Sequence, residues 1–387
     1  MSNLSFVKFV RDIYDNTEDF IPLHPPIFGG NEKKYLNECI DSTFVSSVGK
    51  FVNQFEEMMA EFTGSKYAIA AVNGTAALHM ALILANVKPK DEVITQALTF
   101  ISTANAISYC HATPVFVDVD KDTMGMSPVS LKQFLTENTT QKLNSQTNKI
   151  QPLNNVTGNF VTACIPMHTF GHPVRIEEII QVCGEFNIVV IEDAAESLGS
   201  YRNGQHTGTF AEIGTLSFNG NKTITTGGGG MILTNNEEIA KRAKHLTTTA
   251  KVPHKWNYIH DEIGYNYRLT NLAAALGVAQ MEQLEDILNR KRILASKYKA
   301  FFEGSDIEFV TENENTRANY WLNAVLLKNR VEREAFLDFT NAQGVMTRPI
   351  WELMNRLEMF KTSPKADLSN SEWLADRVVN ISSGVIN

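Results

Sequence analysis

Cysteine is scarce in this sequence, and long apolar runs are absent. The cysteines among the 387 residues are Cys39, Cys110, Cys164 and Cys183. None is in C-x-x-C spacing, which predicts neither a metal site nor a disulfide framework and is typical of a reducing, cytoplasmic compartment. No stretch approaches the roughly 18 uninterrupted apolar residues of a membrane span. Lys8, Arg11 and Asp12 interrupt the first apolar run, which favours a short amphipathic helix over a secretory signal.

Concentrated positive charge is also missing. The chain has 35 Lys and Arg against 43 Asp and Glu, and its formal net charge is -8. Nucleic acid is therefore not an expected partner, because binding to a phosphate backbone needs clustered basic side chains. A small anion can still be bound locally by backbone N–H groups at a helix N-terminus.

Short apolar or β-branched runs alternate with helical patterns between residues 67 and 234. The runs are YAIAAV, DEVITQ, TPVFVDV, FVTACIP, NIVVIED, GTLSF and GMILT. Near-continuous apolar strands separated by helices predict an α/β fold with a mainly parallel sheet between two helical layers. The stretch 136–159 is rich in Asn, Gln and Thr, and we expect it to be an inserted surface loop.

A long helical pattern occupies residues 270–302, where apolar positions recur every three or four residues. A helix of this kind often connects a core domain to a second one, and the remaining segments mix strands with helices. We therefore expect an N-terminal helix and leading segment over 1–30 and a large domain over 31–255. The linking helix and a smaller α+β domain would occupy 256–387.

Two charged residues follow predicted strands. Asp193 ends the run NIVVIED, and the carboxyl end of a parallel strand is where α/β folds place ligands. For an isolated Asp at the end of a strand, a salt bridge or a helix cap would be the better explanation. Lys222 follows GTLSF and precedes the glycines 227–230. Few charges surround it, which suits a lysine that must lose its proton to act as a nucleophile; a flexible hairpin is the alternative.

Two further junctions resemble parts of a cofactor site. Gly74 and Thr75 stand between a strand and a helix, where unpaired N–H groups bind phosphate, although Thr75 could simply cap the helix. Phe100 follows another strand and could stack on a planar ring or pack in the core. A phosphate turn, an aromatic platform, a strand-end carboxylate and a glycine-flanked lysine together match the requirements of pyridoxal 5′-phosphate.

In this order the segments resemble the DegT-type sugar nucleotide aminotransferases, which are fold-type I pyridoxal-phosphate enzymes. The resembling segments include IPLHPPIFGGNE, NGTAALHMAL, LTFISTANAI, IEDAAESLGS, GTFAEIGTLSFNGNKTITTGGGGM, GYNYRLTNLAAALGVAQ and VMTRPIW. They extend over residues 21–387, nearly the whole chain. The resemblance implies a large domain with a mainly parallel seven-stranded sheet and a smaller α+β C-terminal domain.

The resemblance also implies roles for individual residues. Lys222 and Asp193 would be catalytic, with Lys222 forming the Schiff base and Asp193 holding the ring nitrogen protonated. The implied cofactor-binding residues are Gly74, Thr75, Phe100, Asp193, Glu196, Ser217, Lys222 and Asn266. Asn266 would reach the phosphate of a neighbouring subunit's cofactor, so a homodimer with shared active sites is expected. The implied substrate-binding residues are Arg348, Tyr265 and His24.

The substrate implied by the resemblance is a UDP-linked, N-acetylated 4-keto-6-deoxy sugar, with L-glutamate as the amino donor and surface-glycan biosynthesis as the setting. A dTDP-linked or a 3-keto sugar is an alternative. The dehydratase branch of the same family carries His in place of the lysine, and Lys222 argues against it. A protein that binds the cofactor or a sugar nucleotide without catalysis is the alternative from another class.

Overall fold

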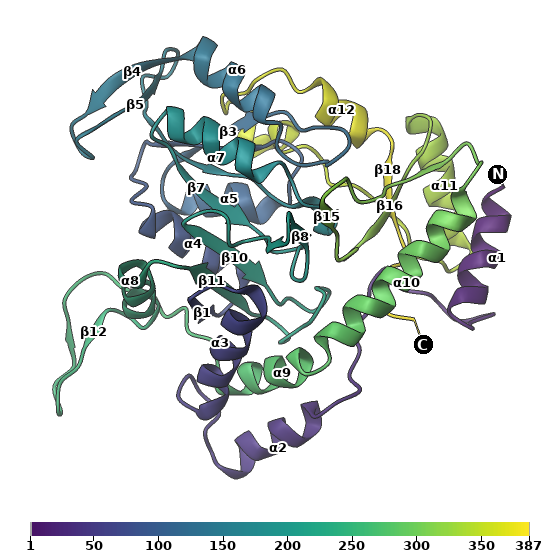
Figure 1. Ribbon diagram of the computed structural model, residues 1–387, viewed down its shortest axis with the longest axis horizontal. Coiled ribbons are helices and arrows are strands. Elements are labelled where there is room, and N and C mark those ends of the chain that lie inside the picture. Colours follow the sequence, from purple (N-terminus) through teal and green to yellow (C-terminus); the bar gives the residue numbers. More distant parts are fainter. Residues whose placement is uncertain (1, 387) are drawn as a thin grey trace.

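The centre of the molecule is a seven-stranded sheet between two layers of helices (Figure 1). The computed structural model describes residues 2–386. The strands of this sheet are β1 (Tyr67–Ala71), β2 (Glu92–Gln96), β3 (Thr113–Val117), β6 (Val161–Ile165), β7 (Val189–Asp193), β10 (Ile213–Ser217) and β11 (Gly230–Thr234). They are ordered β1-β11-β10-β7-β6-β2-β3. Strand β11 is antiparallel to both neighbours, and the other pairs are parallel, which confirms the predicted mainly parallel sheet.

The strands are apolar along their whole length because both faces of the sheet are covered. One face packs against α4 (Gly74–Leu84), α5 (Ile101–Tyr109) and α8 (Glu237–Thr247). The opposite face packs against α3 (Lys50–Thr63), α6 (Pro128–Asn138), α7 (Ile176–Glu185) and α9 (Asn271–Met281). Neighbouring residues of β7 illustrate the alternation, since Ile191 packs with α4 and Val190 with α6 and α7.

A second, four-stranded sheet lies beside the first and has the order β14-β16-β18-β17. Its strands are β14 (Glu308–Phe309), β16 (Asn323–Leu326), β17 (Arg348–Pro349) and β18 (Val378–Ile381). One face packs against α1 (Asn3–Ile13), α10 (Leu284–Phe302) and α11 (Arg330–Ala342), which lie together in Figure 1. The other face shares a core with Leu98 and Phe170 of the large-sheet region. The predicted α+β character of this part is confirmed.

Shorter elements complete the described chain. They are α2 (Glu32–Asp41), β8 (Tyr201–Arg202), β9 (Gln205–His206), β12 (Lys251–Val252), β13 (Ile259–His260), β15 (Thr316–Arg317) and α12 (Ser369–Ala375). Strands β12 and β13 form an arm that projects from the body (Figure 1). Every helix within residues 2–386 is too short or too polar to cross a bilayer.

The expectation of a loop over 136–159 was wrong. This stretch forms a hairpin of β4 (Thr139–Asn144) and β5 (Lys149–Asn154), paired in register over six residues. Asn154 is buried and donates through Nδ2 to Glu92 Oε2 at 2.8 Å. The polar residues that suggested a loop therefore bond a buried carboxylate at the start of β2.

The single long helix predicted over 270–302 was also wrong. The chain forms α9 and α10, which are separated at Glu282 and Gln283. The N–H of Gln283 bonds to Gln280 O at 3.2 Å rather than continuing the α-helical pattern, and its side-chain Nε2 donates to Glu32 Oε1 at 2.7 Å. A side-chain bond to α2 thus accompanies the break, and no Gly or Pro marks it.

Candidate active site

The residues singled out at strand ends meet in one cavity because parallel strands end at the same edge of a sheet. The cavity has a volume of about 230 Å³. It is lined by Asn73, Gly74, Thr75, Leu78, Phe100, Ser102, Thr103, Met167, Asp193, Ala195, Glu196, Ser217, Asn219 and Lys222. Six of the predicted cofactor residues besides Lys222 are in this set, so the structure brings them together around one cavity.

The groups at one end of the cavity suit an anion. Asn73 caps α4 by accepting from Ala76 N at 2.8 Å, which leaves the first amide groups of the helix, including those of Gly74 and Thr75, without helical partners. A Cβ on Gly74 would stand 2.8 Å from Ser217 Cβ, so only glycine lets β10 approach the helix this closely. Backbone N–H groups, two hydroxyls and the positive end of the helix dipole together suit a phosphate.

Asp193 stands at the end of β7 with only 2% of its surface exposed. Its Oδ2 accepts from Thr103 Oγ1 at 2.8 Å, and its Oδ1 accepts from Ala195 N at 3.2 Å. The pKa of Asp193 is raised above its ordinary value, because the effect of burial exceeds the opposing effects of these hydrogen bonds and of the charge of Lys222. Thr103 belongs to α5, so this helix orients the carboxylate toward the cavity.

Glu196 is a second buried carboxylate, 3% exposed, and it faces the lysine. Its Oε1 lies 3.3 Å from Lys222 Nζ, and its Oε2 accepts from Phe170 N at 2.9 Å. Burial raises the pKa of Glu196 to about 7, although the positive charge of Lys222 opposes the shift. Phe170 has a left-handed backbone with φ of 55°, a conformation that costs about 1 kcal/mol or more in a non-glycine residue and places its N–H against the carboxylate.

Lys222 lies between Glu196 and an aromatic ring. Its Nζ stands 3.9 Å from the ring centroid of Trp321, and its side chain is 12% exposed. The glycines that follow serve close approach, since a Cβ on Gly230 would stand 2.4 Å from Asn73 O. Sequence reasoning missed Trp321, because it follows β15 far along the chain and carries no local signal of a site.

Phe100 presents its ring at the mouth of the cavity. It is 46% exposed, and its ring lies 6.2 Å from that of Trp351 in an edge-on arrangement. An exposed aromatic face beside the carboxylates can stack on a planar ligand. Trp351 follows β17, so both parts of the molecule contribute to this rim.

The remaining predicted residues do not line the cavity of one chain. Arg348 is exposed and donates to Asn341 Oδ1 at 2.9 Å. Asn266 is exposed, and Tyr265 beside it stacks edge-on with a histidine ring of α4. His24 is buried, and its Nε2 lies 2.9 Å from Lys291 Nζ. Their predicted roles remain proposals.

Residues 26–385 match the DegT/DnrJ/EryC1/StrS aminotransferase family. The chain belongs to this family. It is 38% identical over 341 residues to the GDP-perosamine synthase of Escherichia coli O157:H7, covering 88% of this chain and 87% of that enzyme. The GDP-perosamine synthase of Vibrio cholerae is 34% identical over 366 residues and is matched over 94% of each chain. This protein is accordingly a sugar nucleotide aminotransferase that uses pyridoxal 5′-phosphate.

Solved structures share the fold of this aminotransferase. The aminotransferase TlmJ of Streptoalloteichus hindustanus superposes with a TM-score of 0.83 at 23% identity, covering 94% of this chain and 93% of that one. Helicobacter pylori PseC, an aminotransferase of pseudoaminic acid biosynthesis, gives a TM-score of 0.82 at 20% identity, with 94% of each chain covered. The predicted fold-type I architecture is confirmed.

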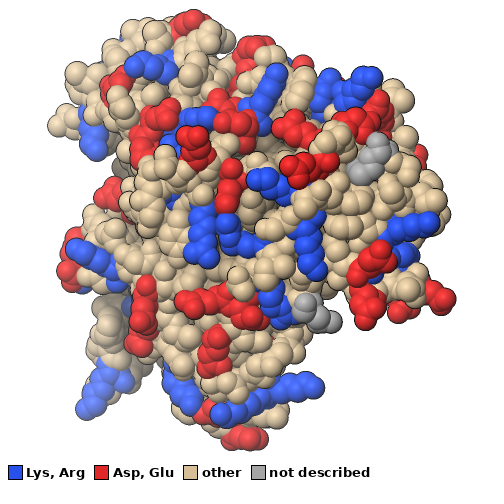
Figure 2. Space-filling view, turned by 45° about the vertical axis from the view of Figure 1, so that its right-hand side comes forward, with Lys and Arg blue, Asp and Glu red and all other residues tan. Residues whose placement is uncertain are grey.

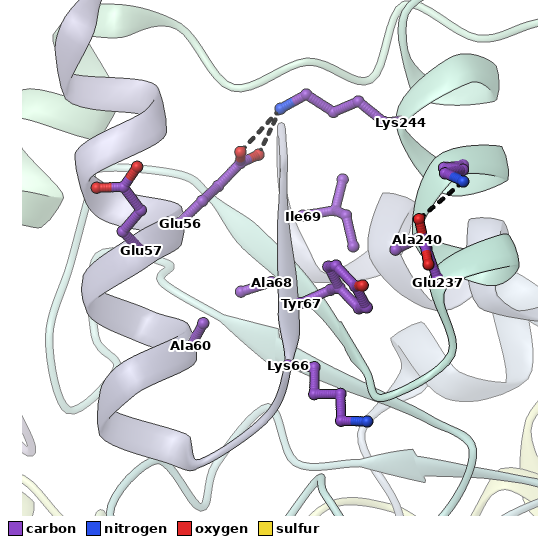
Figure 3. Close-up of a pocket in the computed structure, with 11 residues that line it drawn as sticks. Glu56, Glu57, Ala60, Lys66, Tyr67, Ala68, Ile69, Glu237, Ala240 and Lys244 are labelled. Atoms are coloured by element: carbon purple, nitrogen blue, oxygen red, sulfur yellow. Dashed lines mark hydrogen bonds and ion pairs between the residues drawn. The ribbon is translucent and has the colours of Figure 1, made fainter.

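A larger hollow opens on the surface between α3, β1 and α8 (Figure 3). Four of its charged side chains form two ion pairs, because Lys244 Nζ lies 2.6 Å from Glu56 Oε1 and Lys241 Nζ lies 2.8 Å from Glu237 Oε1. Glu56 also accepts from Ala70 N at 2.9 Å, on the edge strand of the sheet. These contacts pair four of the charges and cap an exposed strand edge, and we assign no ligand to this hollow.

The surface charges of the aminotransferase are mixed. Figure 2 shows basic side chains interspersed with acidic ones over much of the face drawn. Many are paired, as where Arg175 bonds Asp120 and Asp122 at 2.6 Å each. His245, Asp261 and Glu262 gather within 4.8 Å on the surface, but Glu262 is also paired with an arginine, and we assign no metal to them.

Proposed function

We propose that this aminotransferase transfers an amino group from an amino acid, with L-glutamate as the first choice, to a nucleotide-linked 4-keto-6-deoxy sugar used in surface glycans. The observation that supports this is the cavity in which Lys222, Asp193 and Glu196 meet beside the anion cradle, our name for the end of the cavity formed by Asn73, Gly74, Thr75 and Ser217. Its lining offers a candidate contact for each part of pyridoxal phosphate. When bound, this cofactor supplies an aldehyde carbon that reacts with amines and a ring that accepts electrons.

Each residue of the cavity would have a separate task. Gly74, Thr75 and Ser217 would hold the phosphate, and Phe100 would cover one face of the ring. Asp193 would keep a proton on the ring nitrogen, and the bond from Thr103 orients its carboxylate for this. These contacts suit a ring that must accept electrons, because a protonated nitrogen stabilises the charge that develops.

Lys222 would move the protons of the reaction. Its Nζ would take a proton from the α-carbon of the amino acid and, in the second half-reaction, deliver one to the sugar carbon. Glu196, 3.3 Å away, would bind the positive charge of Nζ between these transfers.

The nucleotide and the sugar are the finer part of the proposal. The resemblance in sequence motifs favours a UDP-linked, N-acetylated sugar, whereas the names of two relatives with at least 34% identity contain GDP-perosamine. We therefore propose a 4-keto-6-deoxy sugar linked to UDP or GDP, with the names of the relatives favouring GDP. Arg348 is exposed and would bind the nucleotide or the sugar.

We also propose a homodimer with shared sites. The arm of β12 and β13 carries exposed apolar side chains, with Trp256 at 70%, Tyr258 at 83% and Ile263 at 85% exposure. Exposed aromatic groups on a projecting hairpin are typical of a protein interface. Asn266 follows this arm and would reach the cofactor phosphate of the partner. The four cysteines are buried free thiols, which fits a cytoplasmic enzyme.

Borohydride trapping tests the central assignment. Reduction of the holoenzyme should fix the cofactor on Lys222, as read by peptide mass spectrometry, and Lys222→Ala should abolish amino transfer. Lys244→Ala, which removes a surface lysine paired with Glu56, is the matched control and should retain activity. Trapping on another lysine would refute the proposal.

A panel of keto sugar nucleotides, read by the mass shift of the product, tests the substrate. UDP-linked, GDP-linked and dTDP-linked 4-keto sugars and a 3-keto sugar should be compared with the same donor. Conversion of the 3-keto sugar alone would refute the ring position. Binding of the cofactor with no transfer to any sugar would favour the non-catalytic alternative.

A further inference from the structure

The side chain of Trp321 contacts both ends of Lys222. Its indole Nε1 donates to Asn221 O, the carbonyl of the peptide bond that leads into the lysine, at 2.6 Å. Its ring lies 3.9 Å from Lys222 Nζ. Trp321 is 4% exposed, so neither contact competes freely with water. One buried side chain therefore fixes the backbone of the lysine and also receives its ammonium group.

Asn319, two residues earlier, binds the segments on either side of the same lysine. Its Nδ2 donates to Glu196 O and Leu198 O at 2.9 Å each and lies 3.3 Å from Thr223 Oγ1. Its Oδ1 accepts from Trp321 N at 2.8 Å. The amide thus ties the segment that carries Glu196 to the residue that follows Lys222.

A buried lysine anchors this segment from behind. Lys291 Nζ donates to Trp321 O at 3.1 Å and to Ser383 O at 2.8 Å, and it lies 2.9 Å from His24 Nε2. Lys291 is fully buried, and its acceptors come from different parts of the chain. The position of Trp321 is therefore determined from both sides, by its own side-chain contacts and by its carbonyl.

The lysine needs such support because its own segment is irregular. Lys222 lies in the turns between β10 and β11, and a lysine side chain has many rotamers whose loss on ordering costs entropy. Resting on the proposed role of Lys222, we propose that Trp321 is a positioning residue for this reaction. Its N–H holds the backbone of Lys222, its ring holds the ammonium, and Asn319 keeps Glu196 in reach.

The two functions of Trp321 can be separated by substitution. Trp321→Phe keeps an aromatic ring but deletes the N–H, whereas Trp321→Leu deletes both. Trp373 provides a matched control because Lys121 Nζ lies 4.6 Å from its ring centroid, outside the cavity. Trp373→Leu therefore removes the cation–aromatic contacts of Lys121 and Arg377 without touching Lys222.

The first measurement is the capture of pyridoxal phosphate by the cofactor-free protein, followed by absorbance. In this step Lys222 Nζ forms a bond to the aldehyde carbon, and the aldehyde oxygen leaves as water. Capture needs the neutral amine of Lys222 at a fixed place, and loss of the buried bond from Trp321 Nε1 to Asn221 O leaves an unsatisfied carbonyl beside the lysine, an effect of roughly 5- to 100-fold. Trp321→Leu, which also removes the ring beside Nζ, should therefore capture the cofactor about 10- to 30-fold more slowly. Trp321→Phe should be intermediate, and Trp373→Leu should match the wild type.

The second measurement is the isotope effect for an amino donor deuterated at its α-carbon. Misplacing Lys222 slows proton transfer, so this effect should rise in both Trp321 variants while kcat falls and KM for the donor stays within about twofold. A purely structural role would not move the isotope effect in a folded variant.

The outcomes separate this inference from the proposed function. Wild-type capture and isotope effect in folded Trp321→Leu would overturn the inference while trapping on Lys222 stands. If Trp321→Leu does not fold, Trp321→Phe decides, and wild-type behaviour in it has the same meaning. Absence of trapping on Lys222 in the wild type would instead refute the proposed function.

Discussion

Glu196 should make the cofactor-free protein less stable as the pH rises. Its pKa is about 7 in the folded chain because of burial, against 4.5 as its ordinary value. Between these values the folded protein binds more protons than the unfolded chain, so the free energy of unfolding falls with rising pH and the loss is complete above about pH 7. The difference in pKa corresponds to about 3 kcal/mol.

Glu196→Gln removes this penalty with little change in shape. The amide oxygen can still accept from Phe170 N, as Oε2 does now at 2.9 Å, and the side chain no longer ionises. The variant should therefore be more stable than the wild type by up to about 3 kcal/mol at pH 8, less what Lys222 loses with its carboxylate partner. Below about pH 4.5, where Glu196 is protonated in both the folded and the unfolded chain, the gain in stability should vanish.

Thermal melting of the cofactor-free proteins at about pH 5 and about pH 8 tests the argument. The melting temperature of Glu196→Gln should exceed that of the wild type clearly at the higher pH and only slightly at the lower. Glu57→Gln makes the same chemical change on an exposed side chain and should shift neither. An equal shift of Glu196→Gln at both values, or a loss of stability at the higher one, would refute the reasoning.

Further predictions concern the residues around the cavity. Thr103→Val deletes the hydroxyl that donates to Asp193 and should lower kcat by roughly 10- to 100-fold, because a bond to a charged group contributes about 1.5–3 kcal/mol; an unchanged kcat would contradict the role of that bond. Gly171 has a φ of +93°, and Gly171→Ala would bring a Cβ within 1.8 Å of Asn319 Oδ1. This variant should therefore have a lower melting temperature. Gly184→Ala, in a helix with nothing within 4 Å, should instead stabilise the protein by about 0.5–1 kcal/mol. The pKa of Lys291 is lowered to about 7 by burial, so wild-type stability should rise between about pH 7 and pH 10, and Lys291→Met should flatten that rise in a urea titration.

The seven strands could be predicted because their apolar runs reflect burial on both faces. Asp193 and Ser217 could be placed together for a related reason, since the ends of parallel strands converge whatever the distance in sequence. The hairpin of β4 and β5 could not be predicted because its residues are polar. Its stability depends on hydrogen bonds to other segments, such as the bond from Asn154 to Glu92. The break after α9 depends likewise on a side-chain bond to α2.

Trp321 and Asn319 could not have been found from the sequence. Their local pattern is that of a strand entering a core, and their contacts with Asn221 and Glu196 cross about a hundred positions of the chain. Contacts of this kind depend on how the two sheets are packed together. Periodicity in one segment does not report that packing.

The antiparallel placement of β11 has a consequence for how the segment that carries Lys222 is held in place. The turns that carry Lys222 leave the sheet at Ser217 and return at Gly230, and these two residues are directly paired. Both also abut the start of α4, because Cβ atoms built on Gly74 and Gly230 would collide with Ser217 and with Asn73 respectively. Residues 218–229 thus form a loop whose two ends both lie against the anion cradle. A phosphate bound there would restrain this loop at both of its ends, and would thereby restrain Lys222, the proposed nucleophile, at the other end of the cavity.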